Sequence, residues 1–169
     1  MRRRLGLIGA TLVIATLLVS GCALPQRTPS DGQAEMSIWR GRLAIRIESD
    51  ATTKPQAFSA GFELTGNPQT GTLTLFTPLG STAAALLWSP QTAQMRTHGE
   101  MHDFDSLDAL IKQAVGTDIP VAALFAWLAG DNRLAAGWRA DLSQHAQGRI
   151  TAQRTHPTPF AELRLILEK

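Results

Sequence analysis

Alternation of apolar and polar side chains is the pattern that most limits how this chain can fold. Between residues 39 and 48 every second position is Trp, Leu, Ile or Gly, and the positions between them hold three arginines, an alanine and a glutamate. This period of two is typical of a strand with one buried and one solvated face. Similar runs are predicted to form further strands at 58–64, 72–76, 82–88, 93–98, 138–142, 148–154 and 163–167. Because the first five runs have short connections, they are expected to form an antiparallel meander.

The spacing becomes helical between about 103 and 130. Apolar residues there recur every three or four positions, at Phe104, Leu107, Leu110, Ile111, Ala114 and Val115. Asp103 or Asp105 is suited to cap the start of this helix, and Gly116 to follow its end. A second helix is predicted to begin at Pro120 and to stop before Gly130. The fold class predicted is therefore mainly β, within the α+β group, with a helical insert at about 103–130.

The N-terminal residues have the features of an export signal. Three arginines at 2–4 precede the apolar stretch 5–21, which has small residues at its end. Seventeen residues are fewer than the roughly 20 that span a bilayer comfortably. The segment Val-Ser-Gly-Cys ending at Cys22 resembles the bacterial lipobox, in which the cysteine is lipidated and the signal peptide is cut before it. The alternative is an uncleaved anchor helix with a chance cysteine.

These features predict three parts of the chain. Residues 1–21 are expected to be a lipoprotein signal peptide, and residues 22–37 the lipidated Cys22 with a flexible tether rich in Pro, Ser, Gln and Gly. Residues 38–169 are expected to form the folded domain. Stable anchoring takes more than one acyl chain, and lipidation of the lipobox type supplies three. Ala23, in place of Asp, resembles the signal for onward export to the outer membrane.

Charge and motif content exclude several functions. Removing the three N-terminal arginines from the 16 basic residues leaves 13 against 14 acidic residues, so a nucleic-acid partner is not expected. A single cysteine excludes an internal disulfide, and there is no nucleophile elbow or phosphate-binding glycine loop. The polar cluster of His98, His102, Asp103 and Asp105 is interpreted as a solvated loop with a helix cap, and its role is left open. We therefore expect a protein that is not an enzyme and holds no cofactor or metal.

The unusual content of the chain is apolar. Inward faces of the predicted strands and helices carry Trp39, Leu43, Ile45, Phe58, Phe62, Leu73, Leu75, Leu87, Leu124 and Trp127. These residues can fill an ordinary core, or a sheet that curls round the helical insert can leave part of the interior as a ligand cavity. Leu79 lies between Pro78 and Gly80 in a turn, and a single exposed leucine is in itself common.

Four segments resemble the LolB family of outer-membrane lipoproteins. They are WRGRLAIRI, FSAGFEL, LTLFTPLGST and DIPVAALFAWLAG, which follow the lipobox in that order and span about residues 38–130. The resemblance implies an unclosed antiparallel β-barrel with a helical lid, and a hydrophobic cavity, lined by the apolar residues named above, that takes up acyl chains. It also implies that a protruding loop, here Pro78, Leu79 and Gly80, inserts an apolar residue into the membrane.

The resemblance also implies a function and partners. The protein is expected to accept lipoproteins from a LolA-like periplasmic carrier and to insert them into the outer membrane. It is expected to be a monomer, anchored in the outer membrane by the lipid on Cys22, with its domain facing the periplasm. The chain departs from the family where Gln147-Gly148 is followed by Arg149, and in having a short C-terminus and no tyrosine. The alternative function is a structural or accessory envelope lipoprotein with a filled core.

Overall fold

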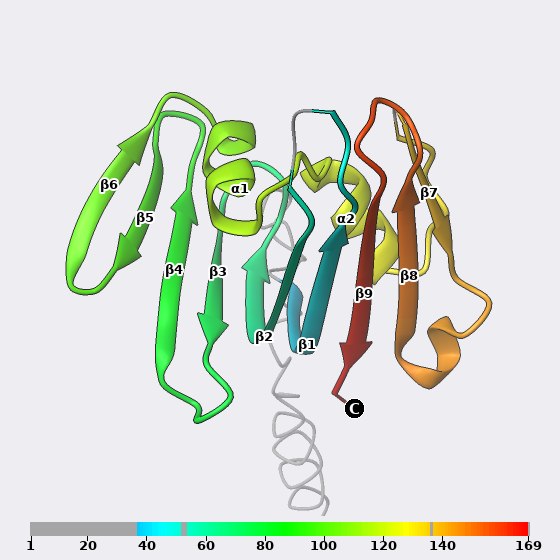
Figure 1. The fold of residues 1–169 in the computed structure, drawn as a ribbon. Coiled ribbons are helices and arrows are strands. Elements are labelled where there is room, and N and C mark those ends of the chain that lie inside the picture. The colour runs from blue at the N-terminus through cyan, green and yellow to red at the C-terminus, as the bar shows by residue number, and fades with distance from the viewer. Residues whose placement is uncertain (1–36, 52–53, 136, 169) are drawn as a thin grey trace, which may run out of the picture. The chain divides into compact units, whose positions relative to one another are not determined.

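The computed structural model of this chain describes residues 37–51, 54–135 and 137–168 (Figure 1). Nine strands form one antiparallel sheet in the order β6-β5-β4-β3-β2-β1-β9-β8-β7. The elements are β1 (Ser37–Ile47), β2 (Gln56–Gly66), β3 (Gly71–Phe76), β4 (Thr82–Trp88), β5 (Ala93–Thr97), β6 (Glu100–Phe104), α1 (Leu107–Val115), α2 (Val121–Leu128), β7 (Trp138–Asp141), the 3-10 helix η1 (His145–Gln147), β8 (Arg149–Arg154) and β9 (Ala161–Leu167). Since β6 and β7 are two separate edges, the sheet is not closed. This confirms the predicted mainly β fold with a helical insert.

The long hairpin β1–β2 joins the two parts of the sheet. β1 pairs with β2 along its whole length, whereas β9 pairs only with Gly41–Ile47 and β3 only with the second part of β2. Gly41 is needed where β9 reaches β1, because a Cβ there would lie 2.0 Å from the carbonyl oxygen of Ile166. In Figure 1 the sheet curves around α2, which lies behind β1 and β9 in this view.

The alternation in the sequence matches the two faces of the sheet. On β1 the inward residues Leu43, Ile45 and Ile47 are buried, and Arg40, Arg42 and Arg46 are exposed. β2 and β3 follow the same rule, and β9 contributes its own alternate residues. Because these inner faces meet the apolar sides of α1 and α2, one continuous core forms between the sheet and the helical insert.

The helical insert begins later than the sequence predicts. Residues 100–104 form β6, so Phe104 belongs to a strand, and Ser106 caps α1 instead of Asp103 or Asp105, its hydroxyl accepting the Ala109 amide proton at 3.1 Å. β6 was missed because Phe104 fits the helical spacing that follows it. The turn before β6 is His98-Gly99, where both residues have positive φ, the geometry of a two-residue hairpin turn. Gly116 ends α1 in the left-handed conformation, as predicted.

Candidate functional site

An apolar cavity lies between the inner face of the sheet and the two helices. It is lined by Leu43, Ile45, Phe62, Leu64, Leu73, Ile111, Val115, Ile119, Val121, Leu124, Leu128, Leu163 and Leu165. Every lining residue is Leu, Ile, Val or Phe, so the cavity offers no polar side chain to a ligand. Its volume is about 40 Å³. An apolar cavity of roughly 150 Å³ takes up one benzene molecule, so the interior as it stands is too small for an acyl chain.

Half of the predicted cavity residues line this cavity, namely Leu43, Ile45, Phe62, Leu73 and Leu124. Trp39 instead packs edge-on against Phe125, with ring centroids 5.4 Å apart, and the fully buried Trp127 donates from Nε1 to the carbonyl of Arg133 at 2.9 Å. Leu75 is buried in the core and Phe58 is half-buried against it. These four residues belong to the same core but stand away from the cavity wall.

Leu87 was assigned to the wrong face of the sheet. Its pairing partner is Thr72, whereas Leu86 pairs with the inward-facing Leu73. Directly paired residues share a face, so Leu86 is fully buried and Leu87 points outward. The register of β4 shifts at the end of β3, opposite a run of three alanines that carries no apolar–polar contrast, so the face could not be read from this strand.

Most of the lining residues that the sequence analysis missed come from the helices and from β9. α1 and the connection after it contribute Ile111, Val115 and Ile119, and α2 contributes Val121 and Leu128. Leu163 and Leu165 lie on β9, which pairs with β1 although the two strands lie at opposite ends of the folded domain in the sequence. Their helical and alternating spacings were visible in the sequence, but no local signal shows that these segments meet.

The loop that carries Leu79 is a compact turn. The Gly80 amide donates to the Thr77 carbonyl at 2.9 Å, and the Thr77 amide donates to the Ser81 carbonyl at 2.8 Å. Pro78 occupies the second position of this turn, which suits its restricted φ, and Gly80 has a φ of 83°. Leu79 is 94% exposed, the highest value among the exposed large apolar residues of the described chain. The turn thus holds a leucine in solvent next to the sheet.

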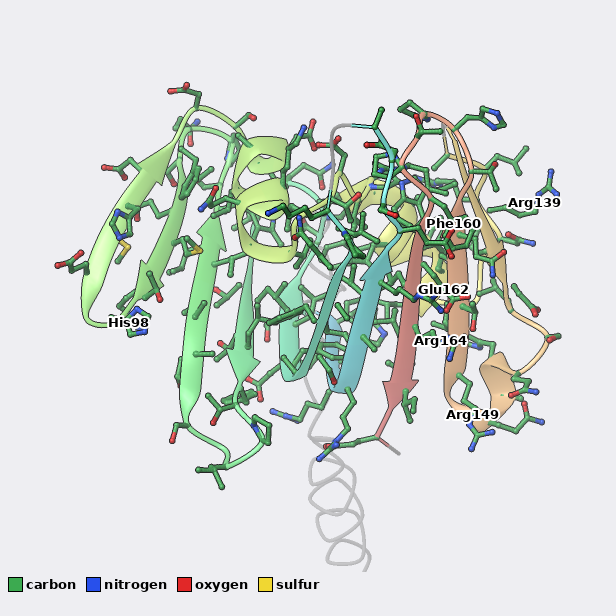
Figure 2. All side chains as sticks on the ribbon, in the orientation of Figure 1. His98, Arg139, Arg149, Phe160, Glu162 and Arg164 are labelled. Carbon is green, nitrogen blue, oxygen red and sulfur yellow. The ribbon has the colours of Figure 1, made fainter. Side chains whose placement is uncertain are left out.

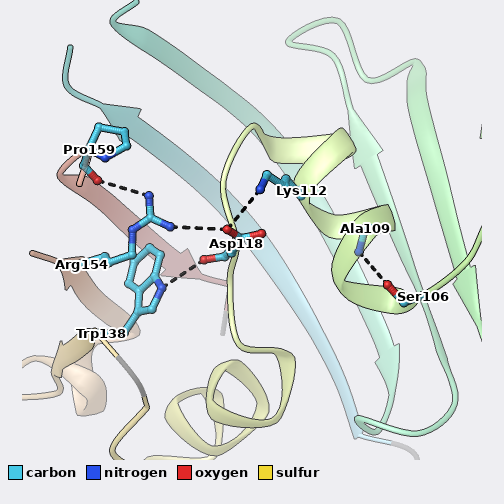
Figure 3. A network of polar contacts seen from close by, with 7 residues as sticks. All are labelled: Ser106, Ala109, Lys112, Asp118, Trp138, Arg154 and Pro159. Carbon is cyan, nitrogen blue, oxygen red and sulfur yellow. Dashed lines mark hydrogen bonds and ion pairs between the residues drawn. The ribbon is translucent and has the colours of Figure 1, made fainter. Parts of the chain in front are cut away.

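A polar network attaches the connection between α1 and α2 to the far side of the sheet (Figure 3). Asp118 lies 3.4 Å from Lys112 Nζ and 3.9 Å from Arg154 Nη1, and its carbonyl accepts the indole proton of Trp138 at 3.0 Å. Arg154 is 6% exposed; it donates from Nη2 to the Pro159 carbonyl at 3.2 Å, and its guanidinium lies 5.9 Å from the Trp138 ring. These contacts join the connection between α1 and α2 to β7 and β8, in addition to the packing of the helices on the core.

The histidines and aspartates near residue 100 do not converge. The Asp103 carboxylate accepts from Gln94 at 2.7 Å, His102 lies 3.7 Å from Glu100, and His98 contacts Thr97 in the turn. Within the described residues, no three His, Cys, Asp or Glu side chains are placed to hold a metal ion. Nor does any helix of these residues have the length and apolar character needed to cross a bilayer. Cys22 and the predicted signal peptide lie outside the described residues.

Comparison with known proteins gives a consistent result. The family model described as outer membrane lipoprotein LolB matches residues 38–158. A protein of Bordetella pertussis named outer-membrane lipoprotein LolB is 38% identical over 184 aligned positions, covering 93% of this chain and 90% of that protein. Proteins of the same name from Bordetella petrii and Azoarcus sp. are 31% and 26% identical, and they cover 90% and 100% of this chain, with 87% and 97% of their own lengths aligned. The fold is an unclosed antiparallel sheet around a helical insert, with a cavity lined only by apolar side chains and a leucine exposed on a turn. Together with these matches, it shows that the chain belongs to the LolB family of outer-membrane lipoproteins.

Proposed function

We propose that this protein receives lipoproteins from a LolA-like periplasmic carrier and inserts them into the outer membrane, where the lipid on Cys22 anchors it. The observation that carries the proposal is the wholly apolar lining of the cavity between sheet and helices in a chain of this family. Relatives aligned over most of the chain are named outer-membrane lipoproteins, which supports the location.

Transfer energetics explain why such a receiver is needed. Burying one methylene is worth about 0.8 kcal/mol, so three acyl chains of about fifteen methylenes cost on the order of 36 kcal/mol to expose to water. A lipoprotein therefore has to pass from one apolar site to another without an aqueous step. Handover in one direction then requires the receiver to bind the chains better than the carrier does.

Because the cavity is small, it has to enlarge when a client arrives. Since about 40 Å³ cannot hold an acyl chain, α1 and α2 have to move off the inner face of the sheet. Six of the thirteen lining side chains belong to the helices and their connection, so the same movement opens the cavity. The acyl chains then contact the same sheet residues that the helices cover in the closed form.

Transfer of a labelled client tests the proposal. Residues 23–169 are mixed with a periplasmic carrier loaded with a fluorescently labelled lipoprotein, and the label on each protein is measured after separation. Movement of the label to this protein is the expected result. If the label stays on a carrier shown to be active, while this domain is folded, the receiver function is wrong.

A second measurement separates the proposed function from the alternative of a structural envelope lipoprotein with a filled core. A fluorescent fatty-acid probe is titrated into the same protein. The receiver takes up the probe, because its helices open, whereas a permanently filled core leaves the emission of the probe unchanged.

A further inference from the structure

A transverse row of residues crosses the outer face of the sheet. The register pairs Phe76 with Gly61, Gly61 with Arg42, Arg42 with Ile166, and Ile166 with Arg149. On every strand of the row at least one neighbouring residue is buried, for example Ala60 and Phe62 on β2 and Leu43 on β1, so the side chains of the row point outward. We call these five residues the basal row; it runs without interruption from β3 to β8.

The basal row combines apolar surface with positive charge. Ile166 is 53% exposed and Phe76 is partly exposed, and the cationic side chains of Arg42 and Arg149 are exposed on either side of Ile166. Neither guanidinium has an ion pair or a side-chain hydrogen bond with any residue in the described part of the chain. The row thus places one exposed aliphatic side chain between two cationic ones.

Acidic residues border the row, but none belongs to it. Glu63 is held by Arg40 at 2.7 Å, and Glu162 is held by Arg164 at 2.7 Å. Glu168 directly follows β9, two residues beyond Ile166, and its amide donates to the Arg40 carbonyl at 2.8 Å. Asp141, opposite Thr151 on β7, lies next to Arg149 in the register, and its carboxylate accepts the Ser143 amide proton at 2.9 Å. The row itself contains two arginines and no acidic residue, so its own charge is positive.

The row is continuous with the turn that carries Leu79. Phe76 is the last residue of β3, and the turn follows it directly. Figure 1 shows the β3–β4 connection and the end of β9 at the same lower edge of the sheet, and Figure 2 shows Arg149 near that edge. The exposed Leu79 and the two arginines thus belong to one edge of the molecule.

We propose that the basal row docks on anionic phospholipid headgroups and so orients the domain with Leu79 toward the bilayer. Guanidinium groups bind phosphate in a bidentate manner, and exposed apolar side chains add to interfacial binding. Each basic residue near an anionic surface contributes about fivefold to partitioning, and the pair about thirtyfold. The inference rests on the proposed function, because it assumes that a client passes into the membrane at the edge of the sheet that carries Leu79.

The test measures binding of residues 23–169 to vesicles. Sedimentation is compared for phosphatidylcholine vesicles and for phosphatidylcholine vesicles that contain phosphatidylglycerol, at low and at high salt. The test variant carries Arg42→Gln and Arg149→Gln. The register supplies a matched control in the parallel row Arg46–Glu162–Gln153–Arg139, because Arg46→Gln with Arg139→Gln removes the same charge from the same face, four residues higher on β1.

We expect the test variant to lose about thirtyfold in partitioning to the anionic vesicles at low salt and little on neutral ones, with the control variant close to wild type. Equal losses in both variants would show a general charge effect and overturn the proposal. So would unchanged binding of the test variant, with thermal unfolding confirming that each variant is folded.

Client acceptance without vesicles keeps the two proposals apart. If the wild-type protein accepts labelled lipoprotein but shows no preference for anionic vesicles, the docking inference fails and the receiver function stands. If wild-type acceptance fails, the receiver function fails, whatever the vesicle result. A test variant that loses acceptance without vesicles would assign the basal row to the carrier and overturn membrane docking.

Discussion

A single methyl group at Gly41 should disturb the junction between β1 and β9. A Cβ at this position lies 2.0 Å from the carbonyl oxygen of Ile166, 2.9 Å from its carbonyl carbon and 3.0 Å from Cα of Leu167. All three atoms are backbone, so no side-chain rotation can remove the clash. The variant Gly41→Ala therefore has to push β9 away from β1, at the place where the two parts of the sheet are joined.

The loss can be worked out from the contacts at that place. Separation of the strands breaks the hydrogen bond from the Glu168 amide to the Arg40 carbonyl, 2.8 Å long, and strains the adjacent pairs, at about 1 kcal/mol per bond. It also partly exposes Leu43 and Leu165, which are 6% and 3% exposed, at about 1–2 kcal/mol together. The sum is about 3–4 kcal/mol, which lowers Tm by about 10–15 °C for a domain of this size.

Thermal unfolding followed by circular dichroism measures this effect, and Gly61→Ala is the matched control. Gly61 lies in the neighbouring strand, opposite Arg42, but its Cβ would meet the Phe76 side chain at 3.4 Å and the Gly41 carbonyl oxygen at 3.9 Å, both without a severe clash. The control is expected to stay within about 1 kcal/mol of wild type. If Gly41→Ala unfolds at the same temperature as Gly61→Ala, the close approach of β9 to β1 does not fix the shape of the sheet.

Three further variants test the site. Leu79→Glu should retain client acceptance and lower insertion into vesicles by about thirtyfold, since about 2 kcal/mol of leucine burial is lost. The control Leu134→Glu, at another exposed leucine, should insert clients normally. Equal insertion by both variants would show that the turn does not take part in insertion. Leu124→Gln, on the half-buried part of the cavity wall, should weaken binding of a fatty-acid probe about tenfold in a fluorescence titration, and unchanged affinity would argue against this cavity. Arg154→Met should lower the free energy of unfolding in urea by about 2 kcal/mol, because it removes a charged donor to a backbone carbonyl. Arg164→Met, at an exposed ion pair, should lower it by less than about 1 kcal/mol. The reverse order would contradict the network at Asp118.

Eight of the nine strands, all but β6, were predictable because one face of the sheet is buried and the other is solvated. β1 shows this best, since arginines occupy three of its outward positions and large aliphatic residues the inward ones. The exposed position of Leu79 followed from the flanking Pro78 and Gly80 together with the family resemblance, and the turn geometry agrees with it. Its action on a membrane stays a prediction.

What could not be predicted depends on contacts between distant parts of the chain. The face of Leu87 is set by the register of β4 against β3, and the alanines before it give no contrast between faces. The pairing of β9 with β1 joins the two ends of the domain, and it brings Leu163 and Leu165 to the cavity. Periodicity indicates which side chains of a segment are buried, but it does not say which other segment covers them.

If the helices open as proposed, the closed interior affects release as well as acceptance. The six helical and connecting side chains that line the cavity would lose on the order of 9–18 kcal/mol if all were exposed when the insert moves away. This opening cost reduces the net affinity for acyl chains, but it is smaller than the roughly 36 kcal/mol that three chains gain on leaving water. The same free energy is recovered when the helices close after a client leaves. Closure therefore favours transfer of the chains to the bilayer, whose interior is as apolar as the cavity, and release needs no nucleotide when the membrane is in contact with the site.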